Sequence, residues 1–383
     1  MTDPAFNHIA LKRLLSRITP PSLISQSCVS PSDLLRDTET LMRRAKQEME
    51  NSTLKAESFN DAEACLGVAH KLLPKLEECR ICPRKCGANR FAGNKGICGF
   101  SSVVRLASQV IHIGEEPPLS GQTGISNRAV TDQIEADHTE SGPVIHFRDN
   151  NIHRKGSGTL FFSGCTLKCS FCQNYPISHM GHGRDMSILD LGLAMLDLQR
   201  KGAYNINLVT GSHFLPQIAL AAALARSCGL EIPIVLNSSG YDLVETMKIC
   251  QALLQIHLPD CKYSSDTLAS KFSGVTDYRE VNVELLTWIA VHSGPLKTDR
   301  NGIAISGALV RHLVLPSQLQ NSIECLDFLA TLRPKLPISL MFQYFQPRPG
   351  HGPEGKVSSG EYKAVLARLE NLGLKGYVQE LAS

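Results

Sequence analysis

The chain has 383 residues, 43% of them hydrophobic, so it can bury a full core in one large domain with appended segments. Its 39 Lys and Arg against 36 Asp and Glu give a net charge of +3, a balance too even to indicate a nucleic-acid-binding surface. It contains no run of about eighteen apolar residues, so no membrane span is predicted.

Residues 1–76 hold no group of cysteines and are predicted to form a helical extension. One apolar helix face consists of Leu11, Leu14, Leu15 and Ile18, and a second helical stretch spans 34–49. Basic residues beside the first face are compatible with an organellar presequence, but early prolines favour an ordinary surface helix. We therefore expect a cytoplasmic protein, with organellar import left open.

Segment 77–121 is rich in cysteine and glycine. Its four cysteines, separated by two, three and eleven residues, are Cys79, Cys82, Cys86 and Cys98. The intervening glycines supply turns that bring backbone amides close to the sulfurs, as a four-cysteine zinc site or a second iron-sulfur cluster requires. The sequence does not choose between these metals. A zinc module that binds nucleic acid is the simpler reading of this segment, but a basic, aromatic surface beside it is missing.

The polar stretch 122–156 has no clear periodicity over most of its length and is interpreted as an inserted surface loop. An apolar strand follows it, and after that strand come Cys165, Cys169 and Cys172 in the pattern Cys-x3-Cys-x2-Cys. Three close thiols suit a four-iron cluster with one iron open to a non-protein ligand better than closed zinc, which needs a fourth ligand. The alternative is three buried structural cysteines. Seven of the 13 cysteines thus fall in two tight groups, which indicates a reducing compartment.

Cys-x3-Cys-x-aromatic-Cys after a strand resembles the signature of the radical S-adenosylmethionine (radical SAM) enzymes. The resemblance implies that Cys165, Cys169 and Cys172 bind a [4Fe-4S] cluster whose open iron is chelated by S-adenosylmethionine. It further implies reductive cleavage of that cofactor to a 5'-deoxyadenosyl radical. Phe171, the aromatic residue before the last cysteine, would then lie near the adenine.

The cysteine-rich segment, together with the Glu-Glu-Pro-Pro-Leu-Ser-Gly run at 115–121, resembles the N-terminal part of radical SAM proteins similar to pyruvate formate-lyase activating enzyme. That resemblance implies hydrogen abstraction, with a glycine of a partner glycyl radical enzyme as one substrate and other proteins, peptides or small molecules left open. A flavodoxin or ferredoxin type of electron donor is also implied.

From 157 to 383 short apolar runs alternate with helical ones, which predicts an α/β fold with a parallel sheet. The six expected strands lie at 159–163, 206–210, 232–236, 256–258, 308–315 and 338–342. Six repeats are too few for a closed eight-stranded barrel. The partial (β/α)6 barrel that is typical of radical SAM enzymes therefore fits the pattern.

Ligands bind at the carboxyl ends of parallel strands, and each predicted strand here ends in polar residues. Strand 2 is followed by Thr210, Gly211 and Ser212, where the family usually has Gly-Gly-Glu to hold the methionyl amino group. The carboxylate is missing, but the carbonyls and hydroxyls of these residues are candidate ligands for the ammonium. His213 next to them is more often structural than catalytic. Asn237 and Ser239 are weaker candidates after strand 3.

Strand 4 ends in Asp260 and Lys262, which match an Asp-x-Lys element of the activating enzymes that lines the cofactor pocket. Such a pair can also be a structural salt bridge. Arg311 on strand 5 resembles an arginine of the same enzymes, and its guanidinium would fork onto the cofactor carboxylate or ribose. Cys261 is a possible hydrogen-atom donor, but strand alternation turns it away from its neighbours.

The other cysteines, Cys28, Cys65, Cys228, Cys250 and Cys325, show no ligand spacing and are expected to be small buried side chains. A competing function is that of a non-catalytic iron-sulfur or zinc protein, a redox sensor or scaffold on the same fold, which the altered strand 2 end favours slightly. Binding of S-adenosylmethionine distinguishes the two.

Overall fold

The structure, a computed structural model, describes residue 23 and residues 30–49, 56–121, 155–348 and 350–379. The predicted first helix face (Leu11, Leu14, Leu15 and Ile18), Cys28 and all but the last two residues of the polar insertion lie outside the described residues. Gly156, assigned to the end of that insertion, is the first residue of strand β2.

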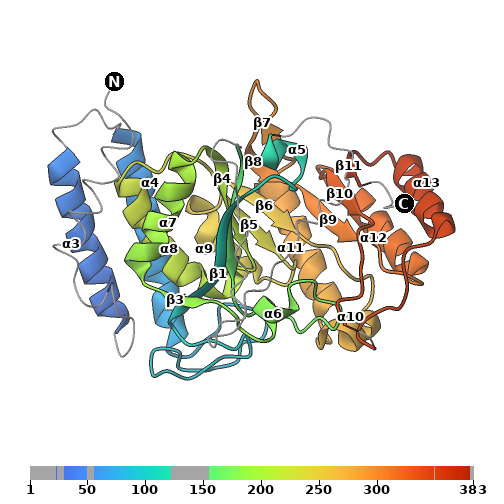
Figure 1. The fold of residues 1–383 in the computed structure, drawn as a ribbon, viewed down its shortest axis with the longest axis horizontal. Coiled ribbons are helices and arrows are strands. Elements are labelled where there is room, and N and C mark those ends of the chain that lie inside the picture. Colours follow the sequence, from blue (N-terminus) through green and yellow to red (C-terminus); the bar gives the residue numbers. More distant parts are fainter. Residues whose placement is uncertain (1–22, 24–29, 50–55, 122–154, 349, 380–383) are drawn as a thin grey trace, which may run out of the picture.

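A mostly parallel sheet forms the centre of the molecule (Figure 1). Its parallel strands are β2 (Gly156–Phe162), β4 (Ala203–Val209), β5 (Ile234–Ser238), β6 (Ile256–Pro259) and β8 (Ala304–Ala308). Between them run α7 (Ile188–Arg200), α8 (Leu215–Ser227), α9 (Val244–Ile249), α10 (Asp266–Ser273) and α11 (Tyr278–His292). The strands are almost continuously apolar because both faces are covered.

A second, three-stranded parallel sheet continues the central sheet beyond β6. It consists of β9 (Val310–Leu313), β10 (Ile338–Met341) and β11 (Gly376–Val378), with α12 (Leu319–Thr331) and α13 (Ser359–Asn371) beside them. A parallel bridge between Asp260 and Arg311 joins β9 to the end of β6. The six predicted strands correspond to β2, β4, β5, β6, β9 and β10, which confirms the α/β, partial-barrel prediction, while the parallel strands β8 and β11 were not predicted.

One long strand was not predicted. β1 (Val104–His112) pairs antiparallel with β2 and with the short β3 (Arg184–Met186), and β7 (Lys297–Thr298) is a similar short addition to β8. β1 mixes polar and apolar residues and is mostly half-buried, so it lacks the apolar run that marks the central strands. Since His112 lies opposite Ser157, β1 carries the chain to the opposite end of the sheet from the cysteine loop, where α5 (Pro117–Ser120) follows.

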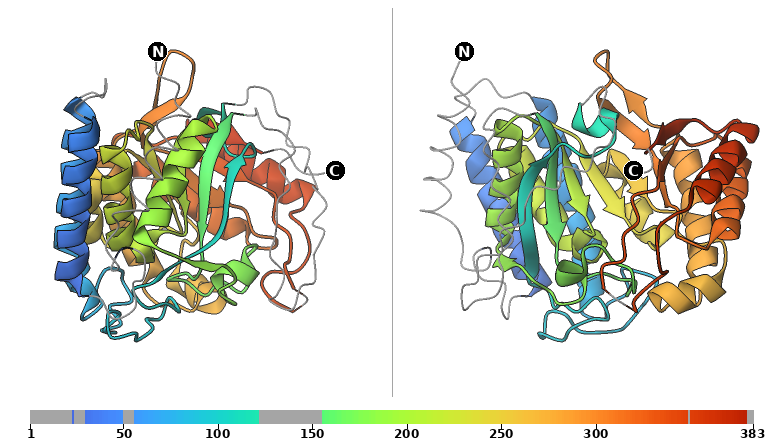
Figure 2. Two further views of the ribbon diagram at one scale, coloured as in Figure 1. Left: turned by 60° about the vertical axis from the view of Figure 1, so that its left-hand side comes forward. Right: turned by 45° about the vertical axis from the view of Figure 1, so that its right-hand side comes forward.

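The predicted N-terminal helical extension is present as α3 (Pro31–Met49), α4 (Ala56–Leu72) and the short 3-10 helix Leu73–Leu76. α4 packs along α8, and all residues of α8 are buried because it lies between the sheet and this extension. Figure 2 shows α3 as the outermost helix on this side. None of the helices in the described part of the chain is long and apolar enough to cross a membrane.

Candidate functional site

One cavity of about 1180 Å³ runs through the interior of the partial barrel. The loop after β2 (Gly156–Phe162) and the short helix α6 (Tyr175–Ser178) lie at one end, and α5 lies at the other (Figure 1). Most of the predicted site residues line it: Cys165, Cys169, Phe171, Cys172, Thr210, Asn237, Ser239, Asp260, Lys262 and Arg311. The structure therefore brings together residues that are up to about 150 positions apart in the chain.

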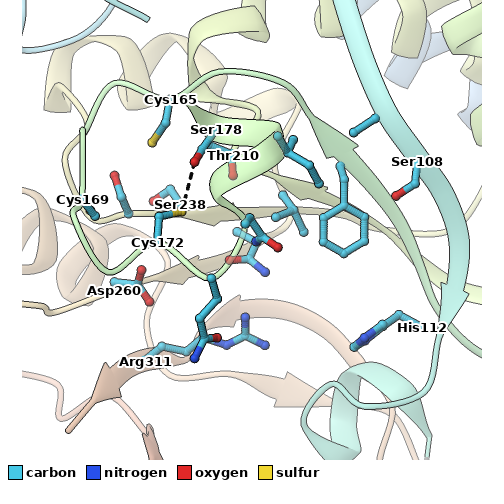
Figure 3. A pocket seen from close by; sticks show the side chains of 18 of the residues that line it. Ser108, His112, Cys165, Cys169, Cys172, Ser178, Thr210, Ser238, Asp260 and Arg311 are labelled. Carbon is cyan, nitrogen blue, oxygen red and sulfur yellow. Dashed lines mark hydrogen bonds between the residues drawn. The ribbon is translucent and has the colours of Figure 1, made fainter. Parts of the chain in front are cut away.

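The three cysteines lie on one loop at the carboxyl end of β2 (Figure 3). Two backbone bonds attach this loop to α10: the Lys168 N–H donates to the Ser273 carbonyl (3.1 Å) and the Ser170 N–H donates to the Phe272 carbonyl (2.7 Å). The Ser273 hydroxyl also donates to the Cys169 sulfur (2.9 Å). Three hydrogen bonds thus hold the loop against α10.

The chemistry of these thiols suits a soft-metal cluster. Burial raises the pKa of Cys165 to about 12 and that of Cys169 to about 11, so both are neutral thiols that metal ligation would deprotonate. In the described part of the chain, no three or more His, Cys, Asp or Glu side chains stand at the spacing of a bound metal ion. Three thiols of one loop beside one cavity nevertheless fit a cluster with an open position, since the cavity leaves room for its fourth ligand.

Phe171 forms an apolar wall next to the cysteines. Its ring packs edge-on against Tyr263 and Phe272, with ring centroids 6.5 and 6.2 Å apart. The side chain is buried but still reaches the cavity surface, where a planar ring of a ligand can contact it.

Asp260 and Lys262 form a partly buried ion pair beside the cavity. Burial lowers the pKa of Lys262, but the Asp260 carboxylate and the nearby Cys169 outweigh it, so the net pKa is raised and the side chain is an ammonium. Asn282 donates to the Asp260 carbonyl (2.9 Å), which fixes the backbone at this strand end. Cys261, between Asp260 and Lys262 in the chain, is buried and does not line the described cavity. This agrees with the alternation of side chains along a strand, which turns Cys261 away from its two neighbours.

The guanidinium of Arg311 points to the α5 end of the cavity, where two carboxylates hold it. Its Nε and Nη2 donate to Glu116 at 2.8 and 2.6 Å, and Nη2 also donates to Glu115. In the structure the fork is onto Glu116, and the predicted fork onto the cofactor stays a prediction. Asn207 on β4 donates to the other oxygen of Glu115 (3.1 Å), so this carboxylate is hydrogen-bonded on both oxygens. Sequence reasoning noted the run at 115–121 but did not assign its glutamates to the cavity.

The end of β4 differs from the prediction in part. Thr210 lines the cavity, with φ at 60°, but Gly211 and Ser212 are not among the described lining residues. Ser212 instead lies close to Asp242 and lowers the pKa of its carboxyl, but burial outweighs this and raises the pKa. Asp242 is a buried carboxylate that the sequence reasoning missed, because it lies 30 residues from Ser212 in the chain.

His213 is structural, as expected. Its Nε2 lies 2.9 Å from the Ser163 carbonyl, and the ring is buried. Burial lowers the pKa of His213 to about 3, so it is a neutral imidazole near neutral pH. It thereby connects the end of β4 to the end of β2 without facing the cavity.

Comparison with known proteins gives a family match and several distant likenesses. Residues 159–258 match the model of the radical SAM superfamily. An uncharacterized protein of Methanocaldococcus jannaschii is 24% identical over 305 residues, which cover 77% of this chain and 71% of that protein.

Solved structures also align with the chain. A domain of a pyruvate-formate lyase-activating enzyme from Bacteroides vulgatus is 18% identical, with a TM-score of 0.30, over 39% of this chain and 82% of that domain. Streptococcus suis SuiB bound to S-adenosylmethionine is 13% identical, with a TM-score of 0.40, over 56% of this chain. The chain spans about half (48%) of the length of SuiB. At these identities and TM-scores, neither structure identifies a substrate for this protein.

Proposed function

Since the chain belongs to the radical SAM superfamily through residues 159–258, we propose that it is a radical SAM enzyme whose [4Fe-4S] cluster is held by Cys165, Cys169 and Cys172. The observation that carries the proposal is that these thiols, Phe171 and the Asp260–Lys262 pair line one cavity. The family implies both the cluster and S-adenosylmethionine.

Different residues of the cavity would bind different parts of S-adenosylmethionine. Phe171 offers an apolar face for the adenine, and Thr210, Asn237 and Ser239 offer hydroxyl, amide and carbonyl groups to its polar parts. Asp260 and Lys262 present one charge of each sign to a zwitterionic ligand. When bound, the reduced cluster would supply the electron, and S-adenosylmethionine the 5'-deoxyadenosyl group, for abstraction of a hydrogen atom from the substrate.

The cavity volume of about 1180 Å³ lies above the usual range of about 300–1,000 Å³ for a single small ligand, so it leaves room for part of a substrate beside the cofactor. By resemblance to the activating enzymes we propose a protein or peptide substrate, with a glycine of a partner enzyme as the first candidate. A flavodoxin or ferredoxin type of protein would supply the electron.

The test is anaerobic reconstitution with iron and sulfide, reduction with dithionite and measurement of 5'-deoxyadenosine formed from S-adenosylmethionine. Wild type should form product, Cys169→Ala should not, and Cys228→Ala, which changes a half-buried cysteine outside both cysteine groups, should behave as wild type. Wild type that holds about four irons per chain yet forms no product would contradict the enzyme proposal and favour a non-catalytic iron-sulfur protein.

A further inference from the structure

The cysteine-rich segment 79–98 gathers four thiols around one glycine. A Cβ added to Gly96 would lie 3.2 Å from the Cys86 sulfur and 3.4 Å from the Cys98 sulfur. Cys79 lies close enough to Cys86 to lower its pKa, and Cys82 is close enough to interact electrostatically with all three. A side chain at position 96 would therefore crowd two of the sulfurs, which glycine avoids.

Backbone N–H groups lie near these sulfurs. Those of Ile81, Arg84 and Ala88 lie close enough to Cys79, Cys82 and Cys86 respectively to favour the thiolate and so lower the pKa that burial raises, and that of Ile97 does the same for Cys86. Such N–H groups stabilise thiolates and are the usual surroundings of metal-bound cysteine. The turn that directs them is fixed by backbone bonds, with the Cys79 N–H donating to the Ala88 carbonyl (3.0 Å) and the Gly87 N–H donating to the Cys79 carbonyl (3.0 Å).

This segment is attached directly to the loop that carries Cys165. Arg84, which lies between Cys82 and Cys86 in the chain, donates through Nε to the Thr166 carbonyl (2.9 Å) and through Nη1 to the Gly274 carbonyl (3.0 Å). Thr166 follows Cys165, and Gly274 ends the helix α10 that holds the same loop. One guanidinium therefore binds both the three-cysteine loop and the end of the helix that holds this loop.

A second arginine and a close backbone approach reinforce this attachment. Arg90 is fully buried, lies close enough to Cys79 to lower the pKa of its thiol, which burial raises, and donates to the His213 carbonyl (2.6 Å) at the end of β4. A Cβ added to Gly164, the residue before Cys165, would lie 2.6 Å from the Cys98 carbonyl oxygen. The ends of β2 and β4 thus rest on the four-cysteine segment.

We propose that Cys79, Cys82, Cys86 and Cys98 bind one soft metal centre whose role is to brace the three-cysteine loop through Arg84 and Arg90. Binding releases the thiol protons to solvent and fixes the turn from which both arginines extend. The sulfurs are near one another but not yet close enough to bind one metal ion together. Binding therefore needs rotation of the cysteine side chains within a turn that is already formed. This proposal depends on the proposed function in one respect, because the loop that is braced is the loop proposed to bind the [4Fe-4S] cluster.

The metal is tested in full-length protein carrying Cys165→Ala, Cys169→Ala and Cys172→Ala together, which cannot form the proposed cluster. Loaded with zinc in one arm and with iron and sulfide in another, this variant should retain about one metal centre per chain, and adding Cys82→Ser should remove it. The better-retained arm identifies the metal. No retained metal in either arm overturns the brace, while a wild type that fails to cleave S-adenosylmethionine bears only on the proposed function.

The bracing is tested by hydrogen exchange of residues 163–173. Arg84→Ala should keep the metal of the four cysteines but raise exchange in the loop by about tenfold or more, because two charge-assisted bonds are lost. Arg80→Ala is the matched control, since Arg80 is an exposed arginine of the same segment paired only with exposed Glu78. Equal exchange in the two variants overturns the brace, and this holds even if Cys82→Ser fails to fold.

Discussion

The two ends of the cavity are built from different kinds of contact. At the cysteine end, the side-chain hydrogen bonds that the structure describes for the thiols are to neutral hydroxyls, between Cys172 and Ser178 at 3.1 Å (Figure 3) and from Ser273 to Cys169, with the Asp260–Lys262 ion pair beside them. At the α5 end, Arg311 is buried between two carboxylates. Thiols with neutral hydrogen-bond partners can exchange those partners when a ligand binds. Breaking a buried ion pair would instead leave a charge buried without a partner, which costs free energy. The cysteine end is therefore suited to chemistry and the α5 end to stability, as in other barrels of parallel strands.

The largest expected effect separates activity from stability at the cysteine end. Cys172→Ala should reduce 5'-deoxyadenosine formation to background because the cluster loses a ligand, while the free energy of unfolding of the metal-free protein changes by less than about 1 kcal/mol. Cys250→Ala, which changes a fully buried cysteine outside both groups, should lower the free energy of unfolding but keep full activity. Full activity in Cys172→Ala would remove Cys172 from the ligand set.

The opposite pattern is expected at the α5 end. Arg311→Ala leaves two buried carboxylates unpaired and should lower the free energy of unfolding by about 3–5 kcal/mol. The control is Arg105→Ala, because the pair of Arg105 with Asp185 (2.8 Å) is exposed and should contribute less than about 1 kcal/mol. Urea unfolding of the two variants measures the difference, and equal losses would contradict the contrast between buried and exposed pairs.

The same end should make stability depend on pH. Burial raises the pKa of Glu116, but the Arg311 guanidinium outweighs it, so the net pKa in the folded protein lies below its ordinary value. The unfolded chain therefore takes up the proton first as the pH falls. The stabilisation is complete above the unfolded pKa of about 4.3 and is lost as the pH falls towards the folded pKa, by about 1.4 kcal/mol per unit of difference.

Glu116→Gln tests this dependence, since it removes the titrating group while keeping its shape. The free energy of unfolding, measured by urea between about pH 6 and pH 3.5, should fall less steeply with decreasing pH in this variant than in wild type. Parallel curves would show that Glu116 does not contribute.

The smallest expected effect concerns the hydrogen bond to Cys169. Ser273→Ala removes a donor to this sulfur, and losing a bond of about 0.5–1.5 kcal/mol should make the cluster potential about 20–60 mV more negative. Ser270→Ala, an exposed serine of the same helix, is the control. A redox titration measures both, and an unchanged potential in Ser273→Ala would show that the bond is absent in the loaded protein.

Local patterns predicted much of this molecule. The three-cysteine loop could be recognised because its cysteines lie within eight residues, and most central strands could be recognised because they are short apolar runs. β1 escaped notice because it is half-buried and mixed in polarity. The pairing of Arg311 with Glu116 joins residues 195 positions apart. Nothing local distinguishes that arginine from one that binds a ligand.

The central claim is that the three-cysteine cluster has an open iron that S-adenosylmethionine fills. Electron paramagnetic resonance of the reduced, reconstituted Cys82→Ser variant, with and without S-adenosylmethionine, tests it most directly, because any cluster in the four-cysteine segment is removed. The account predicts that the cofactor changes the signal of the remaining cluster. Identical spectra in both samples would contradict it.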